Sequence, residues 1–177
     1  MESTETAIRA LSANVVNARF DNFDKSNVND VKNRLIDIIG CAVGGYDASG
    51  NKSLLELMNE WGSLGQATVW ISNSKTAPQN AAMINSIMAR SYDFEVMAGV
   101  LEDKVFAAHH AASIIPTAIA LGEINKINGK ELMTSILVAD DLAARILVAA
   151  GGSPIHMGWD GTMLYSSWGT TAVTGSW

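Results

Sequence analysis

The chain has 177 residues, of which 48% are hydrophobic and 17% charged. This balance is typical of a compact globular protein and excludes a largely disordered one. The formal net charge of −6 argues against nucleic acid or an anionic membrane surface as a partner, because both require a basic patch and the 12 Lys and Arg residues are scattered.

Cys41 is the only cysteine, so the chain forms no intramolecular disulfide and supplies no thiolate cluster for iron–sulfur or zinc. The N-terminal residues carry two acids before any basic residue, which is the reverse of a signal or transit peptide. Two uncharged windows, 105–122 and 161–177, approach the length of a membrane span, but histidine, proline, glycine and hydroxyl residues interrupt them. We therefore expect a cytoplasmic protein that makes no membrane contact.

Helical periodicity dominates the first part of the chain. We expect a helix over residues 4–18 and a second one that begins near residues 26–29. The second has an apolar stripe at Val31, Leu35, Ile38, Ile39 and Ala42. Gly44 and Gly45 are predicted to end it, because glycine permits a left-handed cap. A shorter helix is expected over residues 53–61.

The segment 67–71 is rich in β-branched and aromatic residues and is the one short strand that the sequence predicts. Thr76 and Gln79 have the spacing of a capping box, and Pro78 is harmless in a first helical turn. These signals predict a helix over residues 77–91.

Two further helices are expected in the second half of the chain. Pro116 is tolerated in a first turn but breaks a helix interior, so one helix should begin near Ser113. Asn128 is placed to cap another helix over residues 131–149. No repeat, low-complexity tract or linker is present, which indicates one all-α, helical bundle-like domain over residues 1–177 with at most one short strand. The uncharged C-terminal segment has the character of one that another part of the protein covers. We therefore expect the chain to be the N-terminal portion of a longer two-domain enzyme.

The residues that can carry chemistry are concentrated in residues 91–116. Asp93 and Glu95 form an acidic cluster, and His109 and His110 are two of only three histidines. Polar groups in apolar surroundings are costly unless they are satisfied or used, so their convergence on one hydrophobic region predicts a site. The structural alternative is that Asp93 caps a helix and His109 is a satisfied core residue.

Five pieces of the sequence, spread in order over most of the chain, resemble the MmgE/PrpD family. They are Val31-Lys32-Asn33-Arg34-Leu35-Ile36-Asp37 with Gly40-Cys41-Ala42, then Ala67-Thr68-Val69-Trp70, then Pro78 with Asn80-Ala81-Ala82 and Asn85, then Tyr92-Asp93-Phe94-Glu95, and then His109 ahead of Ile115-Pro116-Thr117-Ala118. This family includes 2-methylcitrate dehydratase, cis-aconitate decarboxylase and an iminodisuccinate epimerase.

The resemblance implies an all-helical first domain, a smaller α+β lid domain that this chain lacks, and a homodimer. It also implies metal-independent chemistry on small polycarboxylates in the cleft between the domains, without a cofactor. Asp93 matches the first aspartate of the family's Asp-Phe-Asp-Asp motif, and His109 matches the histidine of its His-Pro-Ser/Gly motif. These two are therefore the expected catalytic residues.

The chain departs from the family pattern near these residues. Glu95 replaces the second aspartate of the motif, His110 stands where proline is common, and Asp160 lies where many members have a histidine. These departures indicate a divergent branch of the family. The substrates of the characterised members therefore do not identify the substrate of this chain. We expect the substrate to be contacted by Glu95, His110, Ser113 and Asp160.

The chemistry that these residue types favour is proton abstraction from a carbon next to a carboxylate. An imidazole titrates near the working pH, so His109 is the expected base. Asp93 would orient the ring of His109 or bind a substrate hydroxyl. Helix N-terminal amides close by would hold a substrate carboxylate.

Residue types that bind metals are also present, but adjacent histidine side chains diverge and rarely reach one ion. We therefore predict no metal site from Asp93, Glu95, His109 and His110. A second acidic pair, Asp140-Asp141, lies in the last expected helix. Because Arg145 follows Asp141 by four residues, this pair is interpreted as ordinary helix support.

These observations predict a carbon–oxygen lyase, similar to 2-methylcitrate dehydratase, that removes a proton next to a carboxylate of a small di- or tricarboxylic acid. The alternatives are a decarboxylase or an epimerase of the same family. A rival from another class is a catalytically inactive helical dimerisation fragment. The chain by itself is expected to be inactive, because the remainder of the protein is needed to complete the pocket.

Overall fold

The computed structural model describes residues 6–96, 98–101, 104–107 and 109–149. Its helices are α1 (Ala7–Asn17), α2 (Lys25–Gly45), α3 (Asn51–Trp61), α4 (Pro78–Arg90), α5 (Ala111–Asn125) and α6 (Gly129–Ala149), with a 3₁₀ helix over Phe20–Asn22. Its strands are β1 (Ala67–Val69), β2 (Ser74–Thr76), β3 (Ala98–Leu101) and β4 (Lys104–Ala107). The mainly helical class is thus confirmed. None of the helices in these ranges has both the length and the apolar character that a bilayer crossing needs.

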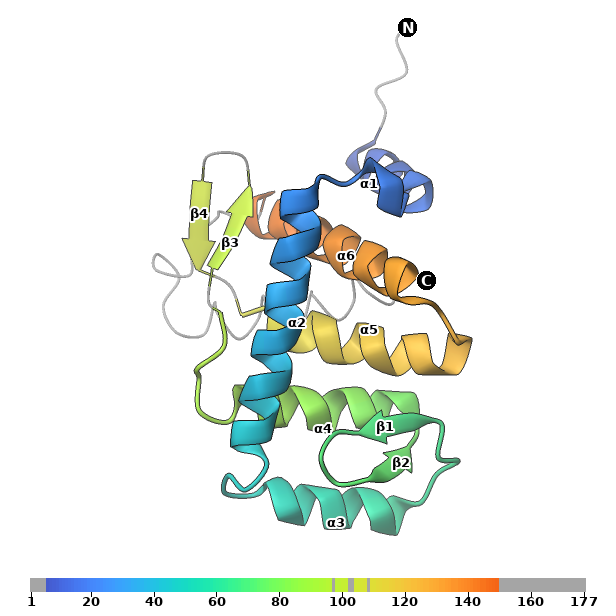
Figure 1. Ribbon diagram of the computed structural model, residues 1–177, viewed down its shortest axis with the longest axis vertical. Coiled ribbons are helices and arrows are strands. Elements are labelled where there is room, and N and C mark those ends of the chain that lie inside the picture. Colours follow the sequence, from blue (N-terminus) through green and yellow to red (C-terminus); the bar gives the residue numbers. More distant parts are fainter. Residues whose placement is uncertain (1–5, 97, 102–103, 108, 150–177) are drawn as a thin grey trace, which may run out of the picture.

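The long helix α2 organises the molecule. The helices α6, α5 and α4 lie across it one after another, and α4 packs along α5 (Figure 1). The helix α3 follows beyond the C-terminal end of α2 and contacts α4. Val31, Ile38 and Ala42 of the predicted apolar stripe are fully buried, whereas Ile39 is 42% exposed. The hydrophobic effect therefore fixes which side of α2 faces the other helices. The largest buried side chains opposite this stripe are Ile84, Met88, Ile114, Ile115 and Ile136.

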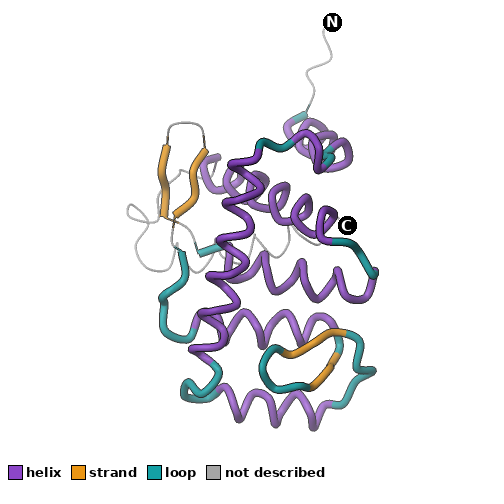
Figure 2. The backbone as a smooth tube through the Cα atoms, viewed as in Figure 1, coloured by secondary structure: helices purple, strands orange, loops and turns teal. Residues whose placement is uncertain are grey.

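Two antiparallel hairpins, β1–β2 and β3–β4, interrupt the helices (Figure 2). The strand predicted at residues 67–71 forms over Ala67–Val69 and pairs with Ser74–Thr76. The sequence analysis allowed at most one strand, and the structure corrects that number, because β2, β3 and β4 were not predicted. The sequence Ser-Lys-Thr of β2 and the Ala-Gly pair in β3 have weak strand propensity, so pairing with the neighbouring strand decides their conformation.

Asn85 ties the first hairpin to α4. Its side-chain oxygen accepts a hydrogen bond from the Trp70 amide at 2.9 Å, and its side-chain nitrogen donates to the Thr68 carbonyl at 3.0 Å. Both polar ends of this buried side chain are therefore satisfied, which fixes the hairpin against the helix.

Of the two predicted N-terminal caps, one forms and one does not. The Asn128 side-chain oxygen accepts from the amides of Lys130 and Glu131 at 2.9 and 3.1 Å, and the Glu131 carboxylate accepts from the Asn128 amide at 2.8 Å. This reciprocal pattern is a complete capping box. Thr76 makes no such bond, because it ends β2 and its hydroxyl pairs with that of Ser63 at 2.8 Å.

The helix α5 begins at Ala111 rather than near Ser113, so Pro116 lies inside it. The proline ring removes the amide that would bond to the Ala112 carbonyl. Residues 111–118 are buried apart from the half-buried Ser113, so their packing outweighs one missing hydrogen bond.

Gly45 serves a close approach of two helices rather than a left-handed cap. The capping residue Tyr46 has a right-handed φ of −55°. A Cβ atom at Gly45 would lie 2.0 Å from the Met88 carbonyl oxygen of α4. Asn51 donates to the Gly45 carbonyl at 2.6 Å and to the Ser91 hydroxyl at 2.9 Å. The C-terminal ends of α2 and α4 are therefore held together.

We expect Gly45→Ala to lower the free energy of unfolding by about 3 kcal/mol, because the added methyl group overlaps backbone that cannot rotate away. Gly40→Ala in the same helix is the matched control. A Cβ there meets nothing within 4 Å, so the change should leave stability unchanged or raise it by up to about 1 kcal/mol. Urea unfolding of both variants measures this difference, and equal effects of the two substitutions would contradict it.

Candidate active site

The structure brings Asp93, Glu95 and His109 together. Asp93 and Glu95 follow α4, and His109 lies between β4 and α5. The Nδ1 atom of His109 is 3.0 Å from Oε1 of Glu95 and 3.8 Å from Oδ1 of Asp93. The β3–β4 hairpin connects the two segments, so the chain that leaves α4 returns beside it at the start of α5.

Arg90, the last residue of α4, joins all three side chains. Its NH1 atom is 2.5 Å from Oδ1 of Asp93 and 2.6 Å from Nδ1 of His109, and it also pairs with Oε1 of Glu95. The sequence analysis did not single out Arg90. The only signal for it was its position three residues before Asp93 at a helix end, which is common for surface ion pairs. Nothing in the sequence indicated that His109 would reach it.

The tautomer of His109 decides which of its two contacts is a hydrogen bond. Arg90 only donates, so its NH1 group bonds to Nδ1 at 2.6 Å when that nitrogen carries no proton. An ionised Glu95 only accepts, so it bonds to Nδ1 at 3.0 Å when that nitrogen carries the proton. Because the carboxylates of Asp93 and Glu95 are stronger acceptors for the two NH1 hydrogens than a neutral ring nitrogen, we expect the second form. That form has its lone pair on Nε2, as in a carboxylate–histidine dyad.

The cluster is buried at one end and open at the other. The side chains of His109 and Glu95 are 4% and 0% exposed, whereas those of Arg90 and Asp93 are 30% and 48% exposed. A ligand therefore meets Asp93 and Arg90 first. At the buried end, Oε2 of Glu95 has no hydrogen-bond partner among the residues that the structure describes. A buried carboxylate oxygen without a donor is costly, which favours a position where a ligand donor completes the site.

Asp93 has a left-handed backbone with φ of 59°. Aspartate is among the few residues other than glycine that adopt this conformation readily. The Asp93 amide donates to the Arg90 carbonyl at 3.2 Å, so the chain turns sharply after α4. This turn places the carboxylate beside the guanidinium of the same segment.

The helix α2 contacts the segment that contains Asp93 and Glu95. Oδ2 of Asp37 accepts a hydrogen bond from the Val96 amide at 3.1 Å, which fixes the backbone next to Glu95. Cys41 lies one turn further along α2. Burial raises the pKa of its thiol above the ordinary value, and the charges of Asp37 and Glu95 raise it further. Cys41 is therefore a reporter of the charge on Glu95.

His110 leaves the cluster and joins a different group of residues. Its Nε2 atom is 2.8 Å from Oδ1 of Asp140, and Oδ2 of Asp140 is 3.1 Å from NH1 of Arg34. These three side chains line a cavity of about 430 Å³. The predicted divergence of the two adjacent histidines is confirmed. The predicted pair of Asp141 with Arg145 also forms, at 2.7 Å, but Asp140 contacts other helices instead of supporting its own.

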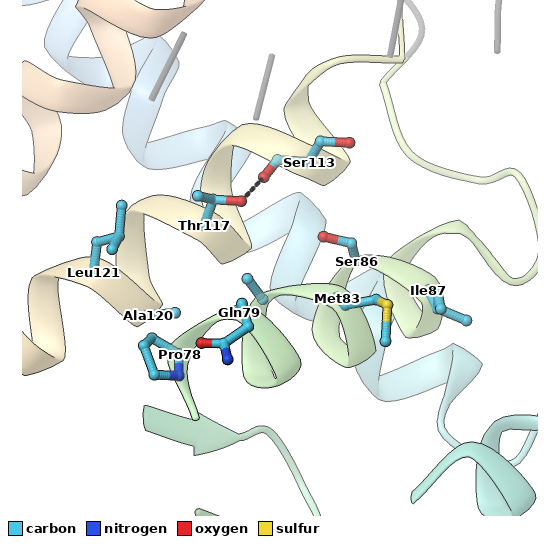
Figure 3. A pocket seen from close by; sticks show the side chains of 10 residues that line it. Pro78, Gln79, Met83, Ser86, Ile87, Ser113, Thr117, Ala120 and Leu121 are labelled. Carbon is cyan, nitrogen blue, oxygen red and sulfur yellow. Dashed lines mark hydrogen bonds between the residues drawn. The ribbon is translucent and has the colours of Figure 1, made fainter. Parts of the chain in front are cut away.

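Ser113 lies on an apolar cavity of about 430 Å³ between α4 and α5, opposite Met83, Ser86 and Ile87 (Figure 3). His109 is not among the residues that line this cavity. The expected substrate contact of Ser113 therefore stays a prediction, as does that of His110. Asp160 lies outside the described residues.

Asp93, Glu95 and His109 also have the composition of a metal site, because one ligand atom from each lies within 4.8 Å of the others. The guanidinium of Arg90 lies among the same ligand atoms and supplies the positive charge that a metal ion would otherwise bring. The expectation of no metal therefore rests on Arg90 and not on the divergence of the two histidines, because one histidine is enough for this cluster.

The chain was compared with models of protein families. The model of the MmgE/PrpD N-terminal domain matches residues 9–177 of the chain, which is the family that the five motifs indicated. No curated protein matches the chain.

We expect Glu95→Gln to speed alkylation of Cys41 by iodoacetamide. Removing a negative charge lowers the pKa of the thiol, so more thiolate is present at any pH below that pKa. The alkylation rate at a fixed pH follows the fraction of thiolate, so it reports the direction of this change. The chain has one cysteine, so the rate is unambiguous. Glu56→Gln on α3 is the control and should leave the rate unchanged. An unchanged rate in Glu95→Gln would contradict the effect of Glu95 on the Cys41 thiol.

Proposed function

The chain belongs to the MmgE/PrpD family, and from this premise we propose that it is the catalytic helical domain of a carbon–oxygen lyase. The proposed substrate is a small di- or tricarboxylic acid that carries a hydroxyl group. The observation that supports the proposal most strongly is the buried pair of His109 and Glu95, in which Glu95 also forms an ion pair with Arg90. Such a pair has the groups that proton abstraction next to a carboxylate requires.

In the proposed reaction, Nε2 of His109 takes the proton from the carbon next to the substrate carboxylate. The electron pair of that C–H bond forms the new C=C bond, and the C–O bond on the neighbouring carbon breaks with its electron pair on oxygen. The proton held by His109 then neutralises the departing hydroxide, and water leaves. No redox partner is needed for this balance.

Glu95 takes the orienting role that the sequence analysis gave to Asp93, because its carboxylate is nearer to Nδ1 of His109 and is fully buried. It stabilises the imidazolium that forms when Nε2 accepts a proton. Its Oε2 atom, which accepts no hydrogen bond from the described part of the chain, is the proposed acceptor for the substrate hydroxyl. Asp93, at the open end, is the proposed contact for a more distal polar group of the substrate.

A carboxylate substrate needs positive partners, because Arg90 balances only one of the two carboxylates in the cluster. The N-terminus of α5 supplies them directly after His109. The amides of Ala111 and Ala112 donate to no other group within the described part of the chain, and the helix dipole adds a partial positive charge there. We propose that these amides hold the carboxylate next to the reacting carbon.

We further propose that a second domain and a second subunit complete the enzyme. A second, lid-like domain would close over the open end at Asp93 and exclude water, and the enzyme would act as a cytoplasmic homodimer. The chain alone would then bind substrate weakly and turn it over poorly. The proposed discriminating experiment is a screen of hydroxylated di- and tricarboxylic acids against the complete protein, followed by the ultraviolet absorbance of the unsaturated product.

We expect His109→Ala in the complete enzyme to lower kcat by about 100-fold or more, the usual scale for the loss of a general base. Circular dichroism and urea unfolding should show an intact fold. Steady-state kinetics on the best substrate of the screen measures the effect. Activity within about twofold of the unsubstituted enzyme would remove His109 from the mechanism.

We expect Asp93→Asn to lower kcat/KM by about tenfold, the scale of one hydrogen bond to a charged group. The fold should stay intact, because asparagine also tolerates a left-handed backbone. Asp141→Asn on α6, which removes a charge from a helix-surface ion pair, is the matched control and should leave kcat/KM unchanged. Equal kinetics of both variants would make Asp93 a structural residue.

A further inference from the structure

The two adjacent histidines are anchored on opposite sides of the chain. His109 is bound to Glu95 and Arg90, while the ring of His110 is bound to Asp140 of α6. Asp140 in turn binds Arg34 of α2. The ring of His110 is nearly buried, and the other two side chains are less than one-fifth exposed.

This group, which we term the His110 clamp, consists of Arg34, His110 and Asp140. It joins three helices at one point, because its members come from α2, the start of α5, and α6. Arg34 is itself held, since its Nε atom donates to Oδ2 of Asp30 at 2.7 Å. Each carboxylate oxygen of Asp140 has one partner, so the ring of His110 has a fixed point of attachment.

The backbone of His110 begins α5. Its carbonyl oxygen accepts the amides of Ser113 and Ile114 at 3.0 and 2.8 Å. Its φ angle is −73°, which is within the range that a proline ring imposes, about −65 ± 15°. The amide of His110 donates no hydrogen bond within the described residues, so a proline at this position would lose none.

We propose that the His110 clamp is a positioning device for His109. A proline ring would fix the backbone at residue 110 covalently, and here Asp140 and Arg34 fix it by holding the side chain. Because only one peptide bond separates the two histidines, a fixed φ at His110 holds the ring of His109 at 3.0 Å from Glu95. His110 is then not a substrate contact and acts only through its neighbour.

This inference rests on the role proposed for His109 in the reaction. Its test measures the imidazole ring directly and does not use enzyme activity. The chain has three histidines, so their ring nitrogens can be assigned by substitution in long-range proton–nitrogen NMR spectra. The isolated chain and the complete protein are both measured, in the unsubstituted form and in His110→Ala, His110→Pro and Asp140→Asn. Asp141→Asn, the neighbouring carboxylate, is the matched control.

In the unsubstituted protein, the ring of His109 should show one sharp signal set with the proton on Nδ1. In His110→Ala and Asp140→Asn, that set should broaden and move towards the mixture of tautomers that a free imidazole shows. His110→Pro should restore the sharp Nδ1-protonated set, although it also lacks the bond to Asp140. Asp141→Asn should leave the spectrum unchanged.

Two results would overturn the proposal. If His110→Ala keeps the unsubstituted tautomer and line widths and only lowers stability, then the clamp is structural and does not position His109. If His110→Pro broadens the signals as much as His110→Ala does, then fixing φ is not what the clamp provides. Loss of activity in His109→Ala would be independent of either result, so the failure of one proposal is distinguishable from the failure of the other.

Discussion

The contact that the candidate site depends on is the one between the Arg90 guanidinium and the buried carboxylate of Glu95. A carboxylate that is fully removed from water requires a positive partner, since the cost of burying an unpaired charge is larger than the gain from any single packing contact. Arg90 supplies that charge from the last turn of α4. The same group also lies 2.6 Å from Nδ1 of His109. One side chain therefore links both carboxylates of the cluster to the imidazole ring.

The rest of the fold places the two halves of this contact. The helices α2 and α4 approach closely at Gly45, and Asp37 of α2 binds the backbone next to Glu95. The β3–β4 hairpin returns the chain to α5, where His109 meets the end of α4. The His110 clamp then holds the start of α5 against α2 and α6. Each of these devices acts on backbone position, whereas the candidate site itself consists of four side chains near the end of α4.

Local signals predicted much of the fold correctly. The apolar stripe of α2, the strand that begins at Ala67 and the cap at Asn128 follow from patterns within a few residues, and the structure has all three. Where non-local contacts decide, the predictions differ from the structure. Thr76 belongs to β2 and its hydroxyl pairs with Ser63, so it does not form the predicted cap. The helix α5 begins before Pro116 and continues through it, because the surrounding residues are densely packed.

The candidate site was predictable only in part, for the same reason. The motif residues Asp93, Glu95 and His109 could be found in the sequence, and the structure places them within one cluster. Arg90 and Asp140 could not, because an arginine at a helix end and an aspartate beside another aspartate have the appearance of surface residues. Their roles come from the register between α4, α5 and α6, which no short pattern encodes.

The account is tested most directly by a double-mutant cycle on Arg90 and Glu95. Urea unfolding is measured for Arg90→Gln, Glu95→Gln and the variant with both substitutions. If a buried ionised Glu95 is held by Arg90, each single substitution removes the partner of the other, and the double variant should be more stable than the sum predicts by about 2 kcal/mol. Effects that add to within about 0.5 kcal/mol would contradict the account, because the two groups would then contribute independently.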